Sequence, residues 1–159
     1  MLGDLIVPNF LSPRGSILIE QDVLVLLSGY RQSAIAAPES GGILLGYRRG
    51  PHLHVSAATV PQPGDRQSRF SFDRQERSHQ RLATAHWRDT GGAGDYLGEW
   101  HTHPELQPTP SDIDTKSWLG VTIRRDIPML FVILGTRTSL WLGVGVRGSL
   151  TGCLVSTSE

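Results

Sequence analysis

Residues 97–118, LGEWHTHPELQPTPSDIDTKSW, constrain the fold of this chain more than any other segment. An extended stretch leads to two histidines one residue apart, His101 and His103, and three prolines stiffen the spacer that follows. Ser111 is then a typical N-cap for a helix with an acidic first turn. Because side chains at positions i and i+2 of a strand point to the same side, both imidazole rings are expected on one face. The segment predicts a strand, a stiff loop and a helix. Either the loop only caps the helix, or the segment holds a metal ion.

The whole chain, residues 1–159, is expected to form one domain with one core, since no linker interrupts it. Apolar spacing that extends to Ile35 predicts a helix within 15–37, and helical composition predicts another over 69–90. The expected fold class is α/β, with one sheet and two or three helices. Strands are expected as a hairpin over 41–60 and as segments at 95–103, 129–135, 139–148 and 150–156.

Composition argues against several function classes. Fifteen Lys and Arg residues balance fifteen Asp and Glu residues, so no net field attracts nucleic acid or an anionic membrane. No apolar run approaches the roughly 18 residues that cross a bilayer, and the N-terminal residues lack the basic start of a signal peptide. The single cysteine, Cys153, is expected to be a buried core thiol. We therefore expect a cytoplasmic protein with no nucleic-acid partner and no membrane association.

The histidine pair has the chemistry of a metal site. Two imidazoles on one face can share a cation at about 2.0–2.1 Å per bond. The following helix offers Asp112 and Asp114 as a third ligand, and an N-cap at Ser111 places Asp114 at the third helical position. Two histidines and one carboxylate leave a fourth tetrahedral position open, which is typical of a catalytic rather than a structural zinc.

A catalytic metal also benefits from a nearby base, and Glu39 in APESGGILLG is the best upstream candidate. It follows a predicted helix end, and two glycines that permit close backbone approach separate it from an apolar strand. The sequence alone does not place Glu39 beside the histidines.

Taken together, these residues resemble the signature of the JAB/MPN (JAMM) metalloprotease family. The family pattern is a distant Glu followed by H-[ST]-H-x7-S-x-x-D, and Glu39, His101, His103, Ser111 and Asp114 match it at every position. The resemblance implies one Zn2+ per chain held by His101, His103 and Asp114. It assigns Glu39 as general acid/base and Ser111 as the residue that stabilises the tetrahedral oxyanion. It also implies a single MPN/JAB-like domain, similar to cytidine deaminase, with a mixed, mostly antiparallel sheet.

The resemblance further implies a substrate class. Active family members cleave the amide bond after the C-terminal tail of ubiquitin or a ubiquitin-like protein, often an isopeptide bond to lysine. The stretches that match substrate-clamping insertions, 61–70 and 120–128, are short here, which favours a compact, stand-alone prokaryotic type. The segments ESGGILLGY, GEWHTHP and SDIDTKSW are most similar to JAB isopeptidases of integrative elements and antiphage (CBASS-type) operons.

The expected function is therefore that of a zinc isopeptidase that removes a ubiquitin-like or C-terminally conjugated protein in a bacterial ubiquitin-like or antiphage defence system. Conjugating enzymes and a signalling enzyme are the expected partners. Three alternatives stay open: a non-catalytic MPN scaffold in a protein complex, a hydrolase that trims the tail of a sulfur carrier, and a small-molecule amidohydrolase.

Two other patterns are weaker. His52 and His54 form a second H-x-H pair, but no spaced acid follows, so they are expected to pack across strands or lie on the surface. Gly143, Gly145 and Gly148 match a dinucleotide-binding pattern without the helix that it requires, so they are expected to be turn residues. Three aromatic residues are expected to pack beneath the histidine site: Trp87, Trp100 and Trp118.

Overall fold

The computed structural model describes residues 3–157, and its centre is an eight-stranded mixed sheet with strand order β1-β2-β4-β3-β7-β8-β9-β10. The β2–β4 and β7–β8 pairs are parallel and the other pairs are antiparallel, as predicted for a mostly antiparallel sheet. The elements are β1 (Leu5–Pro8), β2 (Ser16–Ile19), α1 (Gln21–Ser28), β3 (Gly41–Arg49), β4 (His52–Ala58), β5 (Arg66–Ser68), β6 (Ser71–Asp73), α2 (Glu76–Asp89), β7 (Asp95–Thr102), α3 (Asp112–Thr122), β8 (Met129–Leu134), β9 (Ser139–Val146) and β10 (Ser149–Ser156).

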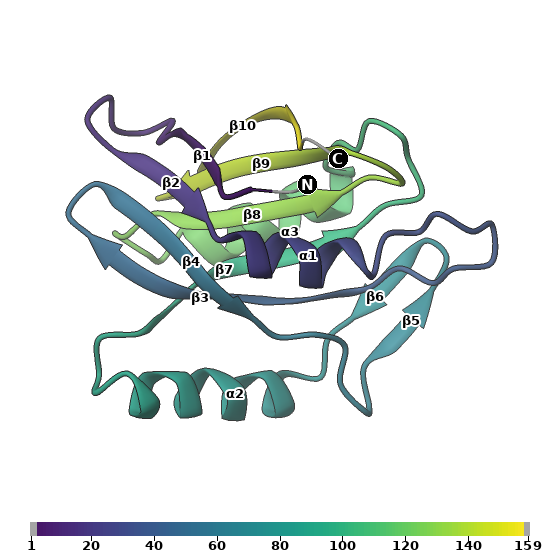
Figure 1. The fold of residues 1–159 in the computed structure, drawn as a ribbon, viewed down its shortest axis with the longest axis horizontal. Helices are drawn as coiled ribbons and strands as arrows, with labels where there is room; N and C mark the ends of the chain where they lie inside the picture. The colour runs from purple at the N-terminus through teal and green to yellow at the C-terminus, as the bar shows by residue number, and fades with distance from the viewer. Residues whose placement is uncertain (1–2, 158–159) are drawn as a thin grey trace.

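Helices cover both faces of the sheet. In Figure 1, α1 lies in front of it, α3 lies behind it, and α2 runs below β3. All six residues of β8 are buried, because this strand faces a core on each side. Leu130, Val132 and Leu134 pack in the core under α1, whereas Phe131 and Ile133 pack with Trp118 of α3. The predicted α/β class, with one mixed sheet and three helices, is confirmed.

Two predicted helices are partly wrong. The segment expected as a helix within 15–37 begins with strand β2, and its helix, α1, ends at Ser28. Ile35 is 86% exposed in the loop beyond α1, since Gly29 ends the helical spacing. In the segment expected as a helix over 69–90, helix α2 begins only at Glu76. The preceding residues form the β5–β6 hairpin, a two-stranded sheet that pattern analysis missed.

The prediction that three glycines are turn residues holds only for Gly148, which has a positive φ of 75° at the β9–β10 turn. Gly143 and Gly145 lie within β9 instead. The indole of Trp141 covers Gly143 and Gly152, and a Cβ at either glycine would lie 2.2 Å from a ring carbon. Gly143 and Gly152 therefore allow the Trp141 indole to pack closely against the backbone of the sheet.

The prediction of a buried thiol is also wrong, because Cys153 is exposed on β10, at the edge of the sheet. An edge strand has a neighbour on one side only, and most residues of β10 are exposed. No helix in the described part of the chain is both long and apolar enough to span a bilayer.

A buried polar network links α2 and the 60–75 segment, which contains the β5–β6 hairpin, to the eight-stranded sheet. The Asp65 carboxylate accepts hydrogen bonds from the backbone N–H of Gln62 (2.7 Å) and Gln75 and contacts His79 Nε2 at 2.8 Å. His79 Nδ1 lies 2.6 Å from Thr59 Oγ1, which also accepts the N–H of Ile43 in β3. His79 is 1% exposed, so this Asp–His–Thr arrangement has a structural role.

Replacing Asp65 by Asn is expected to destabilise the fold in a pH-dependent way. Burial acts to raise the pKa of Asp65, but the hydrogen bonds from Gln62, His79 and Gln75 outweigh it and hold this pKa below its usual range. The stabilisation is therefore present above about pH 4 and is lost as the pH falls through the lower folded-state pKa. We expect Asp65→Asn to lower the free energy of unfolding by about 1.5–3 kcal/mol at pH 7. Urea unfolding should show this difference narrowing below about pH 4.

The matched control is Asp126→Asn, since Asp126 pairs with Arg147 on the surface with 87% of its side chain exposed. Its unfolding curve is expected to follow that of the wild type. A deficit in Asp65→Asn that stays constant down to pH 2.5 would contradict the proposed charge effect.

Candidate metal centre

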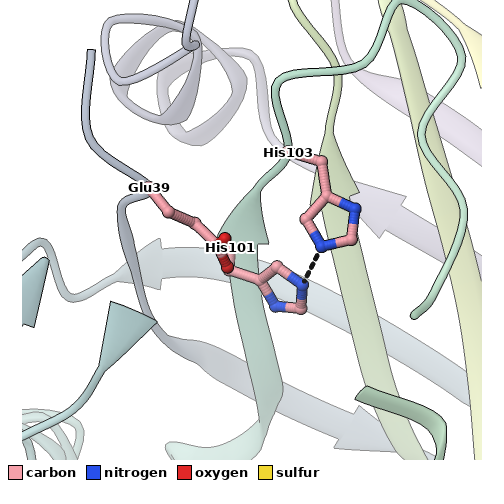
Figure 2. A group of neighbouring side chains, drawn as sticks. All are labelled: Glu39, His101 and His103. Carbon is pink, nitrogen blue, oxygen red and sulfur yellow. Dashed lines mark hydrogen bonds between the residues drawn. The ribbon is translucent and has the colours of Figure 1, made fainter. Parts of the chain in front are cut away.

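The two histidines come from the end of β7, where the chain stays extended past the last strand residue. The N–H of Thr102 donates to Ser40 O at 2.9 Å, and the N–H of His103 donates to Leu134 O of β8 at 3.0 Å. This pairing on both sides keeps His101 and His103 on one face of the sheet, as predicted. Their Nε2 atoms are 3.1 Å apart and point toward each other in Figure 2.

The predicted cap of α3 is present and directs a carboxylate at the histidines. Ser111 Oγ accepts the N–H of Asp114 at 3.1 Å, and Asp114 Oδ2 accepts the N–H of Ser111 at 2.9 Å. The same Oδ2 lies 3.3 Å from His101 Nε2 and 3.1 Å from His103 Nε2. Of the two acids considered from the sequence, Asp114 thus faces the histidines, and Asp112 is exposed.

The donor set fits a small divalent cation. Three donor atoms, one from each of His101, His103 and Asp114, are separated by 3.1–3.3 Å. Ligand atoms bound tetrahedrally at about 2.0–2.1 Å lie about 3.3–3.4 Å apart, close to these separations. Glu39, His101 and His103 also form a buried group whose ligand atoms all lie within 4.8 Å of one another. The cluster is therefore a candidate metal site.

Glu39 reaches this cluster from the loop before β3. Its N–H donates to Ser68 O of β5 at 2.6 Å, and its carbonyl accepts a hydrogen bond from Gln67 Nε2 at 3.1 Å. The side chain extends toward His101 (Figure 2), and the residue is 7% exposed. Burial raises the pKa of Glu39, the nearby imidazoles oppose this, and the Asp114 charge adds to it. A raised carboxyl pKa suits a group that accepts and returns a proton near neutral pH.

The charges of the ligand candidates are coupled. Burial acts to raise the pKa of Asp114, but its contacts with both imidazoles outweigh burial and hold this pKa far below its usual range, so the carboxylate is ionised. Burial also acts to lower the pKa of His103, but the bond to Asp114 and the charges of Asp114 and Glu39 outweigh it, so this pKa is raised.

Glu105 orients the second histidine. Its Oε1 lies 2.8 Å from His103 Nδ1, the ring nitrogen that points away from the cluster. A proton on Nδ1, donated to this carboxylate, leaves the lone pair of Nε2 directed at the cluster. A carboxylate partner of this kind is common behind metal-binding histidines. Glu105 was not predicted from the sequence, although it lies only two residues after His103.

A groove of about 480 Å³ opens onto the cluster, with Glu39, His103, Ser111 and Asp114 among its lining residues. Its apolar lining comes from Phe70 and Phe72 at the β5–β6 hairpin and from Pro104 and Ile113. Phe70 and Ile113 are 75% and 80% exposed, so each presents a large apolar surface beside the groove. The hairpin residues of this apolar lining were not predicted from the sequence, because strands of three residues carry no usable periodicity.

Of the three tryptophans expected beneath the site, one is there. The indole of Trp118 packs on His101 with ring centroids 5.2 Å apart and donates from Nε1 to Glu99 Oε2 at 3.1 Å. Trp100 belongs to the core on the α1 side of the sheet. Trp87 is 58% exposed on α2, so its prediction is wrong.

The second H-x-H pair has structural contacts, as predicted. His52 Nδ1 accepts the N–H of Ser16 at 3.0 Å, which joins β4 to β2. His54 Nε2 lies 2.6 Å from a carboxylate oxygen of Glu20, and its ring packs against Tyr47. These side chains are therefore engaged by their neighbours in the sheet.

Residues 26–143 match the family model described as prokaryotic homologs of the JAB domain. Among curated proteins, a relative from Escherichia coli (strain TW11681) is 37% identical and one from Vibrio cholerae serotype O1 is 41% identical. The alignments cover 84% and 83% of this chain and 85% and 88% of those proteins, and both relatives are named "CD-NTase/cGAS isopeptidase". A solution structure of a protein from Desulfitobacterium hafniense matches the fold with a TM-score of 0.62 at 19% identity, covering 84% of this chain and 87% of that one.

Proposed function

The chain belongs to the prokaryotic JAB family, and on that premise we propose that it is a zinc-dependent isopeptidase that acts on a CD-NTase joined through its C-terminus to another molecule. The family resemblance inferred from the motif is thereby confirmed. The observation that supports the proposed chemistry is the convergence of His101, His103 and Asp114 at metal-ligand spacing, with Glu39 beside them.

In this proposal His101, His103 and Asp114 hold one zinc ion per chain. Bound there, zinc supplies Lewis acidity, which polarises the scissile carbonyl and makes water a competent nucleophile near neutral pH. The ionised Asp114 offsets part of the cation's charge. Glu105 holds His103 in the tautomer whose Nε2 is free to bind.

Glu39 transfers the proton. Its carboxylate takes a proton from the attacking water and gives it to the amine nitrogen as the amide bond breaks, so the amine leaves as a neutral group. Burial raises the pKa of Glu39, which makes its carboxylate a stronger base toward the attacking water. Ser111 Oγ already accepts the N–H of Asp114, so its own proton serves as a donor to the oxyanion.

The groove supports a protein tail as substrate. An extended C-terminal segment fits between the β5–β6 hairpin and the start of α3, where Phe70, Phe72 and Ile113 offer apolar contacts. The name of the relatives, "CD-NTase/cGAS isopeptidase", supports a CD-NTase as the conjugated protein. We further propose that the chain works in the bacterial cytoplasm beside conjugating and signalling enzymes of an antiphage defence system.

A cleavage assay tests this function. The probe is a CD-NTase whose C-terminal residue is joined by an amide bond to green fluorescent protein, incubated with the zinc-loaded chain. We expect one cut at the junction, seen as a free CD-NTase C-terminus by intact mass, and loss of cleavage with a zinc chelator. An intact probe after incubation with folded, zinc-loaded protein would instead favour the non-catalytic scaffold.

A further inference from the structure

Gln32 lies in the loop that joins α1 to β3, seven residues before Glu39, and is 2% exposed. A buried side-chain amide needs partners for its oxygen and its nitrogen, because an unpaired polar group costs about 1–3 kcal/mol. Gln32 does not line the groove that opens onto the metal site. Its burial therefore calls for an explanation other than contact with substrate.

The Gln32 amide bonds to three separate segments. Its Nε2 donates to Ala37 O at 3.1 Å and to Arg69 O at 2.7 Å, and its Oε1 accepts the hydroxyl of Thr102 at 2.9 Å. Carbonyl oxygens only accept hydrogen bonds, so the orientation of the amide is determined by its partners. The side chain thus acts as a three-way connection inside the protein.

Each partner belongs to a different segment beside the proposed catalytic residues or the groove. Ala37 is two residues before Glu39, Arg69 follows β5 in the turn of the hairpin, and Thr102 lies between His101 and His103. Two further hydrogen bonds involve Glu39 itself and the residue that follows it. The Thr102 hydroxyl accepts the N–H of Ser40 at 3.0 Å, and the N–H of Glu39 donates to Ser68 O of β5.

We propose that Gln32 is a positioning residue that holds Glu39 in register with the two histidines and ties this register to the β5–β6 hairpin. The proposal rests on the function proposed for Glu39. Proton transfer requires Glu39 to lie within hydrogen-bond reach of the reacting atoms. A misplacement of about 1 Å costs on the order of 100-fold in rate. Without the Gln32 amide, the loop that carries Glu39 keeps its bonds to β5 and the two bonds between Ser40 and Thr102. It loses the links that run through Gln32 to Arg69 and to the Thr102 hydroxyl.

The first test uses Gln32→Met, which keeps the volume and removes the three bonds, on the CD-NTase–fluorescent protein probe. We expect kcat to fall by about 10- to 100-fold, with KM within about 3-fold and zinc content unchanged. In a Glu39→Ala background, Gln32→Met is expected to cause less than about 3-fold further loss, because residues that act through one group are not additive. An unchanged kcat, or a full additional loss without Glu39, would overturn the proposal.

The second test needs no substrate, so it separates this proposal from the proposed function. Amide hydrogen exchange of Glu39 and Ser40 is expected to accelerate by about tenfold or more in Gln32→Met, while exchange in β8 stays as in the wild type. Unchanged exchange would overturn the proposal even if the wild type cleaves the probe. A wild type that leaves the probe intact would instead reject the proposed function.

A matched control is Gln62→Met, since among residues 3–157 Gln62 Nε2 bonds only to the nearby Val60 O, at 2.7 Å. It is expected to leave kcat and the exchange of Glu39 unchanged. If Gln32→Met does not fold, Thr102→Val replaces it. This variant removes the bond to Gln32 Oε1 and also the acceptor of the Ser40 N–H, so exchange is then read at Glu39 alone. The same loss of kcat and faster exchange are then expected, and their absence would reject the proposal.

Discussion

His103→Ala is expected to lose zinc and activity together, from about one zinc ion per chain in the wild type to a tenth or less. The physical reason is the donor geometry, in which His103 Nε2 lies 3.1 Å from both His101 Nε2 and Asp114 Oδ2. Removing one of the three proposed protein ligands leaves two, and the ionised Asp114 then has no bound cation to offset its charge. Elemental analysis of dialysed protein measures the metal, and the probe cleavage assay measures the activity.

The chain provides its own control for this prediction. His52→Ala removes a histidine from the second H-x-H pair, which contacts Ser16 rather than the metal cluster. It is expected to keep its zinc and its activity. If His103→Ala kept stoichiometric zinc, the assignment of His103 as a ligand would be wrong.

Glu39→Ala is expected to separate metal binding from turnover. It should retain zinc, because His101, His103 and Asp114 have the spacing of tetrahedral ligands without a contribution from Glu39. Loss of the proton carrier is expected to lower kcat by about 10²- to 10⁴-fold. Glu39→Gln keeps the size of the side chain but cannot carry the proton, so it is expected to lose as much. Zinc content and kcat are measured on the same samples.

Two outcomes would contradict this role. Loss of zinc in Glu39→Gln would make Glu39 a ligand, in keeping with the close grouping of its carboxylate with His101 and His103. Full activity in either variant, on the probe that the wild type cleaves, would show that another group transfers the proton.

Predictions from local patterns are confirmed where the residues that matter are close along the chain. The capping box between Ser111 and Asp114, and the shared face of His101 and His103, follow from the periods of a helix and a strand. Several predictions that depended on side-chain packing were wrong. Gly143 lies inside β9, where the indole of Trp141 occupies the space that a Cβ would need. Cys153 is exposed because its strand is at the edge of the sheet.

The sequence by itself therefore determined the family, the donor types and their local spacing, because these depend on residue identity and on backbone periodicity over a few turns. Only the tertiary structure decided that Glu39 meets the histidines, that the β5–β6 hairpin walls the groove, and that Gln32 joins these parts. Ser40 and Thr102, whose hydrogen bond lies beside Glu39, are 62 positions apart in the chain. Such contacts form only when strands pair and side chains pack, so no local pattern specifies them.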